Sequence, residues 1–457
     1  MIRDNTLNTT NNKRMLMRVA TIAGPIALQS LIASSLNLVD NLMIGGLGEL
    51  PLNAVGVSVQ VFFVYWMIVF GFSSGASTFV SQFYGTKDFA NIRKTVGFTI
   101  VVSMSVGIIF FVGAQLFPEY ILRVFTRFPE VIETGVPYIR IGAPCFLCVA
   151  VIQPLVISLR ATQQTRYPLY ASVSALCLNT FLNYCLIYGH FGMPRMGVSG
   201  AALATVIARL VELSLLICFV MIRQNPVRGH VREFGDFNAE LAGRIVKNAL
   251  PTTINETMWG LGTSLYVAAF ARISITAGAA IQACNTVNNL FIMAAFSVGD
   301  AILIMVGQKL GEGEKEYAYR MTRNLLRLAV IIGVIMGLLM LIFSKPIISL
   351  FDFTDAGARD AWRILIVYAA VIWLSVLTGS MVTGVLRCGG DTRYAMFTEV
   401  GTVWLIGVPL AFITSLVLHW PIYLAVLAVK SEEAVKFFFL FSRYRSRKWL
   451  NNVIKGL

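Results

Sequence analysis

The stretch LRATQQTRY at residues 159–167 recurs as LRCGGDTRY at residues 386–394, with five of nine positions identical at a separation of 227. Two further matches keep a spacing of 226. The triplet AGP at 23–25 matches ALP at 249–251, and QFYG at 82–85 matches QKLG at 308–311. Three matches in one order at nearly one spacing indicate that the chain contains an internal duplication.

The composition identifies the class of protein. Of the 457 residues, 57% are hydrophobic and 13% are charged, whereas a soluble domain carries about 25% charged residues. The net charge of +14 predicts no nucleic-acid partner, because its placement follows membrane sidedness. The seven cysteines lie mostly in apolar runs without a CxxC pair, and the three histidines are scattered. We therefore expect a polytopic membrane protein without a disulfide framework or a histidine metal site.

Transmembrane helices need about 20 mostly apolar residues. The sequence predicts twelve such spans, at residues 18–44, 54–82, 95–117, 135–158, 167–190, 197–222, 245–270, 278–308, 324–344, 362–386, 394–418 and 420–442. With the N-terminus placed in the cytoplasm, 27 of the 37 Lys and Arg residues fall on the cytoplasmic side. Cytoplasmic loops carry such an excess. The bias therefore predicts that both termini are cytoplasmic, and we expect the cell membrane as the location.

The duplication then predicts the architecture. Each repeat holds six spans, so both halves enter the membrane from the same side and are related by a pseudo-two-fold axis along the membrane normal. We expect an all-α fold with an N-terminal lobe at residues 1–222, a polar cytoplasmic linker at 223–244 and a C-terminal lobe at 245–457, around a central cavity. Pro25 and Pro251 occupy matching places early in the first and seventh spans. Because proline kinks a helix, they are hinge candidates, the alternative being static kinks.

One carboxylate, Asp40, lies inside the first span, about one helical turn before a glycine-rich exit. A charge at bilayer depth costs about 2.5 to 3.5 kcal/mol on insertion scales, so such residues usually face a protein interior or an aqueous path. The alternative is that Asp40 is hydrated near the helix end or paired structurally. A repeat offset of 226 places Tyr266 at the equivalent position. An acid found in only one repeat favours a functional site over packing symmetry.

Three polar residues are predicted to lie near Asp40. Asn179 and Asn183 are four apart and share one helix face. The small-residue run at 197–205 brings helix backbones close and ends on the Thr205 hydroxyl. An acid with amide and hydroxyl oxygens suits a sodium ion, and the same acid could instead carry a proton. The alternative for the two asparagines is interhelical hydrogen bonding, worth about 0.6 kcal/mol per contact.

The second half contains further polar residues at bilayer depth. Glu256 is unmatched in the repeat, since its equivalent is Ser30. Glu256 and Asp300 are second-lobe candidates. Two simpler predictions concern the other charges. Arg209 and Glu212, three apart, are expected to pair, and the charges at 430–436 are expected to interrupt the twelfth span as a local cluster.

These stretches resemble the multidrug and toxic compound extrusion (MATE) family. The sequence VDNLMIGGLG at 39–48, followed by LNAVG at 52–56, resembles its first-helix signature, and residues 386–393 and 160–166 resemble its loops after the tenth and fourth helices. The pair at 255–256 resembles the acidic position of its seventh helix. The resemblance implies that the protein exports cationic or amphipathic drugs by rocking two lobes, driven by inward sodium or proton flow. It places a cation site at Asp40, Asn179, Asn183 and Thr205, and a second-lobe candidate at Glu256.

Two departures leave the coupling ion open. One branch of the family has a second acid where this chain has Asn183, and another has an aspartate in the tenth helix, where residues 362–386 have none. The runner-up function is a flippase of lipid-linked saccharides, but few basic residues are deep in the spans. An intramembrane enzyme is disfavoured because DDxxD, GxSG and HExxH motifs are absent. A channel is disfavoured, because two covalently fused lobes with acids in different places fit alternating access better than a symmetric pore. We expect a monomer in contact with membrane lipid, with no cofactor beyond the coupling ion.

Overall fold

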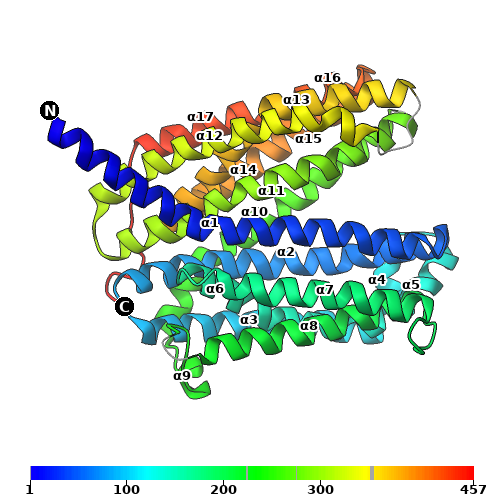
Figure 1. Cartoon of the computed structure of the whole chain (residues 1–457), viewed down its shortest axis with the longest axis horizontal. Coiled ribbons are helices and arrows are strands. Elements are labelled where there is room, and N and C mark those ends of the chain that lie inside the picture. Colours follow the sequence, from blue (N-terminus) through cyan, green and yellow to red (C-terminus); the bar gives the residue numbers. More distant parts are fainter. Residues whose placement is uncertain (1, 223–224, 274, 350–354) are drawn as a thin grey trace. The chain divides into compact units, whose positions relative to one another are not determined.

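The computed structural model describes residues 2–222, 225–273, 275–349 and 355–457, and every regular element in these ranges is a helix (Figure 1). The elements are α1 (Ile2–Gly45), α2 (Glu49–Gly85), α3 (Phe89–Leu116), α4 (Pro118–Arg123), α5 (Pro129–Gly142), α6 (Pro144–Ala161), α7 (Arg166–Tyr188), α8 (Val198–Met221), α9 (Val231–Gly235), α10 (Ala239–Ala271), α11 (Ile275–Gly311), α12 (Lys315–Ile348), α13 (Asp355–Gly379), η1 (Ser380–Leu386), α14 (Thr392–Thr402), η2 (Val403–Gly407), α15 (Val408–Phe412), η3 (Ile413–Val417), α16 (Ile422–Lys430) and α17 (Glu432–Arg445). Helices satisfy their own backbone groups, as a bilayer requires.

The twelve predicted spans coincide with helical structure. Eight are single helices, namely α1, α2, α3, α7, α8, α10, α11 and α12, and four are composite, namely α5–α6, α13–η1, α14–η3 and α16–α17. Among the described residues, nine helices are long and apolar enough to cross a membrane. The prediction of an all-α integral membrane protein is confirmed.

The last composite span is interrupted where charged residues enter it. Helix α16 ends at Lys430 and α17 begins at Glu432, with Ser431 between them. The predicted interruption of this span is therefore confirmed. The three segments η1, η2 and η3 are π-helical turns. Such wide turns are rare and often lie at functional sites.

The chain divides into two compact units. We call Leu28–Val80 with Asp88–Ala249 the N-terminal unit, and Met1–Ala27, Ser81–Lys87 and Leu250–Leu457 the C-terminal unit. The first part of α1 and the last turn of α2 thus belong to the C-terminal unit. The predicted lobe boundaries at 222 and 245 stay a prediction.

The duplication is visible in the backbone. Gln163 and Gly390 occupy equivalent places in the two copies of the repeated stretch, and both have a positive φ, of 62° and 72°. Lys87 and Gly313, which follow the other repeated motif, have φ values of 60° and 83°. A positive φ is uncommon outside glycine. Two non-glycine residues in this conformation, each matched by a glycine in the other copy, indicate that both copies use the same turns.

The motif QFYG/QKLG packs its two copies against each other, at the ends of α2 and α11. A Cβ atom at Gly85 would overlap the backbone of Gln308, and a Cβ at Gly311 would overlap the backbone of Gln82. The contact is therefore reciprocal. Small residues allow helix backbones to approach this closely, so these two glycines set the distance between the helix ends.

We expect Gly85→Ala and Gly311→Ala each to destabilise the protein by about 1–3 kcal/mol, because the added methyl group meets backbone that cannot rotate away. Thermal melting of the purified protein measures this change. Gly401→Ala in α14 is the matched control, since its Cβ meets no atom within 4 Å. Equal melting temperatures for Gly85→Ala and Gly401→Ala would contradict the close crossing.

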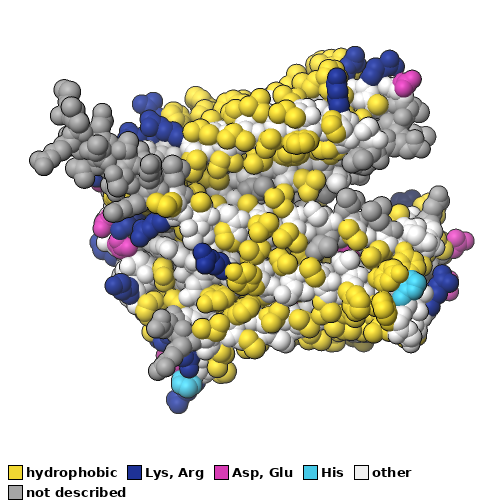
Figure 2. All heavy atoms as spheres, viewed as in Figure 1, with side chains coloured by type: hydrophobic (Ala, Val, Ile, Leu, Met, Phe, Trp, Pro, Cys, Tyr) yellow, Lys and Arg dark blue, Asp and Glu magenta, His cyan; other side chains and the backbone are white. Residues whose placement is uncertain are grey.

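The surface carries apolar side chains along the helices. Figure 2 shows hydrophobic side chains spread over the helix flanks, with most Lys and Arg at the helix ends. Ile109 on α3 is 68% exposed and Leu405 in η2 is 78% exposed. Exposed apolar surface on this scale is unusual for a soluble monomer and is expected of helices that face lipid.

Candidate functional site

The candidate ion site lies in the N-terminal unit, where α1, α7 and α8 meet. Asn179 and Asn183 lie on one face of α7 and are 6% and 2% exposed. Helix α8 approaches α7 closely, since a Cβ at Gly200 would lie 2.7 Å from the Leu186 carbonyl oxygen. This approach brings Thr205 beside Asn179. The predicted effect of the small-residue run is therefore confirmed.

Asp40 is half-buried and is held by α7. Asn183 Nδ2 donates to Asp40 Oδ1 at 2.9 Å and also lies 3.4 Å from Asn179 Oδ1. Asn179 Nδ2 lies 3.3 Å from Thr205 Oγ1. The four residues predicted from the sequence are therefore in one hydrogen-bonded group.

The amide of Asn179 has a second orientation with better partners. Turned over, its nitrogen donates to Asp40 Oδ2 at 2.9 Å and its oxygen accepts from the Thr205 backbone N–H at 3.3 Å. Amide orientations are assigned from such networks. In this orientation each oxygen of Asp40 accepts from one asparagine. Two donors in a buried place stabilise the ionised carboxylate.

One polar atom of the group is unused. Asn183 Oδ1 is buried and has no hydrogen-bond partner among the described residues. A buried unpaired carbonyl costs about 1–3 kcal/mol. A carboxylate, amide oxygens and a hydroxyl are hard oxygen ligands of the kind that bind alkali and alkaline-earth cations. The donor set therefore fits a small cation, for which Asn183 Oδ1 would be a ready ligand.

The second-lobe candidates lie in the C-terminal unit. Glu256 on α10 forms an ion pair with Arg387, which follows η1, and their side chains are 12% and 2% exposed. Asp300 on α11 is half-buried and has interactions of its own. Glu256 was predictable as an acid within a span, whereas its basic partner was not, because 131 residues separate the two.

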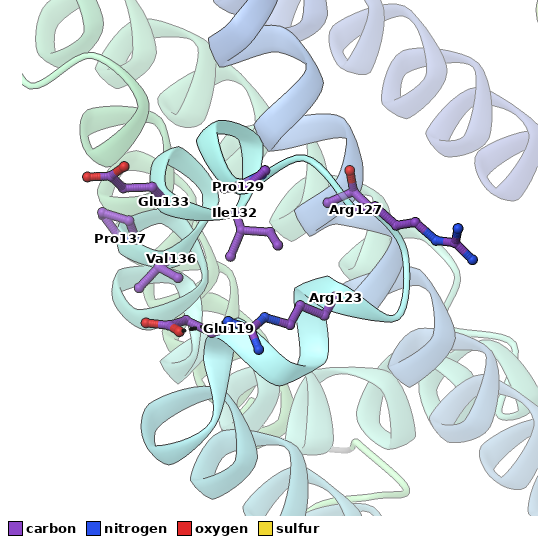
Figure 3. Close-up of a pocket in the computed structure, with 9 residues that line it drawn as sticks. Glu119, Arg123, Arg127, Pro129, Ile132, Glu133, Val136 and Pro137 are labelled. Atoms are coloured by element: carbon purple, nitrogen blue, oxygen red, sulfur yellow. Dashed lines mark ion pairs between the residues drawn. The ribbon is translucent and has the colours of Figure 1, made fainter.

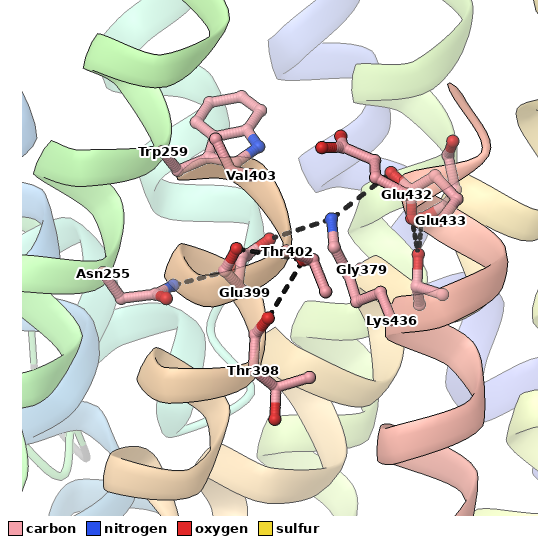
Figure 4. A network of polar contacts seen from close by, with 12 residues as sticks. Asn255, Trp259, Gly379, Thr398, Glu399, Thr402, Val403, Glu432, Glu433 and Lys436 are labelled. Atoms are coloured by element: carbon pink, nitrogen blue, oxygen red, sulfur yellow. Dashed lines mark hydrogen bonds and ion pairs between the residues drawn. The ribbon is translucent and has the colours of Figure 1, made fainter. Parts of the chain in front are cut away.

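The same unit contains a larger polar network that the sequence did not predict, around Glu399 and Lys436 (Figure 4). Glu399 on α14 accepts a hydrogen bond from Asn255 at 2.6 Å, and Lys436 on α17 lies 3.8 Å from it. The sequence feature that could have predicted this network is Glu399 itself, an acid inside the apolar run 394–418. Tyr266, which contacts Glu432 in the same network, could not be predicted from the sequence, because a tyrosine within a transmembrane span is ordinary.

Two other predictions concern charges and prolines. Arg209 Nη1 lies 2.6 Å from Glu212 Oε2, so the predicted pair on α8 is confirmed. Pro25 and Pro251 lie inside α1 and α10, which continue through them. Their role as hinges stays a prediction.

A pocket of about 670 Å³ lies at the surface of the N-terminal unit, around α4 and α5 (Figure 3). It is lined by Glu119, Arg123, Thr126, Arg127, Pro129, Ile132, Glu133, Val136 and Pro137. None of the predicted site residues lines it.

Comparison with known proteins places this arrangement in a family. The family model MatE matches the chain twice, over residues 25–185 and 249–413. The chain belongs to the MatE family. The two matches agree with the internal duplication and with a twelve-helix, two-lobe architecture. MatE is a family of membrane transporters, so the predicted transporter class is confirmed.

Relatives and solved structures agree with this assignment. The chain is 26% identical to the probable multidrug resistance protein YoeA of Bacillus subtilis over 86% of its length and 85% of the relative. It is also 26% identical to the probable multidrug resistance protein NorM of Thermotoga maritima, over 86% and 84%. A crystal structure of a MATE protein in the straight conformation superposes with a TM-score of 0.85, at 17% identity, over 94% of this chain and 96% of that chain. This MatE protein therefore shares the fold over nearly its whole length.

Proposed function

We propose that this MatE protein is a secondary active exporter of cationic or amphipathic drugs, driven by inward flow of sodium ions or protons. The observation that carries the proposal is the Asp40 group. Its half-buried carboxylate accepts a hydrogen bond from Asn183, and a second one from Asn179 when that amide is turned over. The buried Asn183 Oδ1 beside it has no hydrogen-bond partner among the described residues. The names of the relatives support drugs as the substrate class.

The residues of the group supply the coupling. A buried carboxylate is costly while it is ionised, and a bound sodium ion or proton removes that cost. Asp40, Asn179, Asn183 and Thr205 would hold the ion. An ion or a drug shifts the protein between two conformations only by its difference in affinity for them. Competition between ion and drug for one conformation would then give antiport, with the protein acting as a monomer.

Transport into liposomes tests the proposal. Purified protein should give saturable drug flux when a sodium gradient or a proton gradient is imposed, and flux with only one of them identifies the coupling ion. Linear, gradient-independent flux would indicate a channel. Movement of a lipid-linked saccharide without drug flux would indicate a flippase and overturn the proposal.

We further propose a cell-membrane location with both termini in the cytoplasm. Cysteines introduced at Glu130 or at Arg359 should then react with an impermeant thiol reagent in intact cells, whereas a cysteine in the linker 223–244 should not. The exposed native Cys177 and Cys218 are first replaced by serine. Labelling of the linker with neither outer position labelled would reverse the orientation.

A further inference from the structure

In the C-terminal unit, three glutamates lie around one lysine (Figure 4). Glu399, Glu432 and Glu433 are 9%, 3% and 7% exposed, and Lys436 among them is 2% exposed. These residues come from α14 and α17. An ionised carboxylate is expensive to bury unless it is paired, so the state of each acid follows from its partners.

Two of the acids share the lysine. Lys436 Nζ lies 3.4 Å from Glu433 Oε1 and 3.8 Å from Glu399 Oε1. Each also accepts from a neutral donor, since Thr378 Oγ1 donates to Glu433 at 2.6 Å and Asn255 Nδ2 donates to Glu399 at 2.6 Å. Both acids therefore have a cation and a donor.

Glu432 differs from its neighbours. It forms no ion pair among the described residues, and its one hydrogen-bond partner there is Tyr266 Oη, 2.5 Å from Glu432 Oε2. Lys430, the other nearby base, has its Nζ 5.6 Å from the ring centroid of Tyr368. An ionised Glu432 would be a buried charge without a contacting cation, which costs several kcal/mol.

The hydroxyl group of Tyr266 has two oxygen neighbours, which bear on the protonation of Glu432. Its hydroxyl is 2.5 Å from Glu432 Oε2 and 3.4 Å from the carbonyl oxygen of Val403. A phenol has one hydrogen and can donate to only one of these oxygens. A protonated Glu432 can donate to Tyr266 Oη, which leaves the phenol hydrogen for the Val403 carbonyl oxygen.

The space around this contact fits a proton better than a metal ion. Gly407, at the end of η2, faces it, and a Cβ added there would overlap both Tyr266 Oη and the Glu432 carboxyl. The backbone of η2 is therefore packed directly against the contact, and no group of three His, Cys, Asp or Glu side chains among the described residues could hold a metal ion. Val403, at the start of the same π-helical segment, supplies the accepting carbonyl.

We propose that Glu432 is a proton-binding site, occupied at neutral pH and separate from Asp40, whose proton is held in a chain from Glu432 through Tyr266 to the Val403 carbonyl. When Glu432 loses this proton, its carboxylate attracts Lys436 away from Glu433 and Glu399. The other charged groups around the contact are Glu433 on the same helix, Lys430 on α16 and Glu399 on α14. Proton binding by Glu432 is independent of the proposed function, and only a role of this proton in transport would rest on it.

Two measurements on purified protein test the proposal without any transport. Infrared spectroscopy at neutral pH should show the carbonyl band of protonated carboxyl groups, weaker in Glu432→Gln than in the wild type and unchanged in Glu433→Gln. Thermal melting should show Glu432→Gln near the wild type, because glutamine is neutral and keeps a donor for Tyr266. Glu433→Gln should melt lower, because it deprives Lys436 of one carboxylate.

Both the infrared band and the melting temperatures can contradict the proposal. A Glu432→Gln protein that keeps the wild-type band, or that melts as low as Glu433→Gln, would overturn the proposal. If Glu432→Gln does not fold, Tyr266→Phe serves instead, since it removes the hydroxyl that the carboxyl group contacts. It should shift the band without abolishing it, and an unshifted band would equally overturn the proposal. Failed drug flux in liposomes would bear on the proposed function alone.

Discussion

We expect Asp40→Asn to abolish gradient-driven drug efflux, while the purified variant still binds drug. Asparagine keeps the size of the side chain and can still hydrogen-bond with Asn183, which donates to Asp40 at 2.9 Å. It cannot change charge when an ion binds or leaves. The coupling should therefore disappear, whereas drug affinity should survive, since apolar walls supply much of the affinity of such cavities.

The measurement combines efflux in cells, under imposed sodium and proton gradients, with drug binding to purified protein and a check of surface expression. Asp236→Asn is the matched control, because that side chain is 75% exposed and pairs with Lys94 rather than with a residue of the Asp40 group. It should transport like the wild type. Wild-type efflux by Asp40→Asn under both gradients would remove Asp40 from the mechanism.

We expect Glu256→Gln to lower both stability and efflux. Its carboxylate pairs with Arg387, whose side chain is 2% exposed. Breaking a buried ion pair from one side typically costs about 3–5 kcal/mol, because a buried charge loses its compensation. We expect a variant that still reaches the membrane but melts at a lower temperature and exports less drug.

A second variant separates a structural role from a functional one. In Glu256→Gln/Arg387→Gln both charges are removed, so much of the stability should return, since replacing a whole buried pair is often neutral. Efflux should stay low if Glu256 acts in transport. Recovery of efflux together with stability would make the pair structural only.

Much of the fold could be read from the sequence because membrane insertion is a local property. A run of about 20 apolar residues must be a helix in a bilayer, whatever surrounds it, so all twelve spans were predictable. The repeat spacing was readable from the identical residues of the two copies at 159–167 and 386–394. Their turns also share a positive φ at Gln163 and Gly390, although these two residues differ. The Asp40 group was predictable in part, because Asn179 and Asn183 are one helical turn apart.

The tertiary structure alone decided which buried charges meet. Glu256 and Arg387 are 131 residues apart, and no local pattern joins them. Lys436 reaches Glu399 on α14 as well as Glu433 on its own helix. That packing leaves Glu432 with Tyr266, whereas the sequence predicted only a local charged cluster. The sequence by itself determined the spans, the duplication and the acids at bilayer depth, because insertion cost depends on each segment alone. Which acid is paired and which is left for a proton depends on distances of a few ångströms between helices, and these exist only after the helices pack.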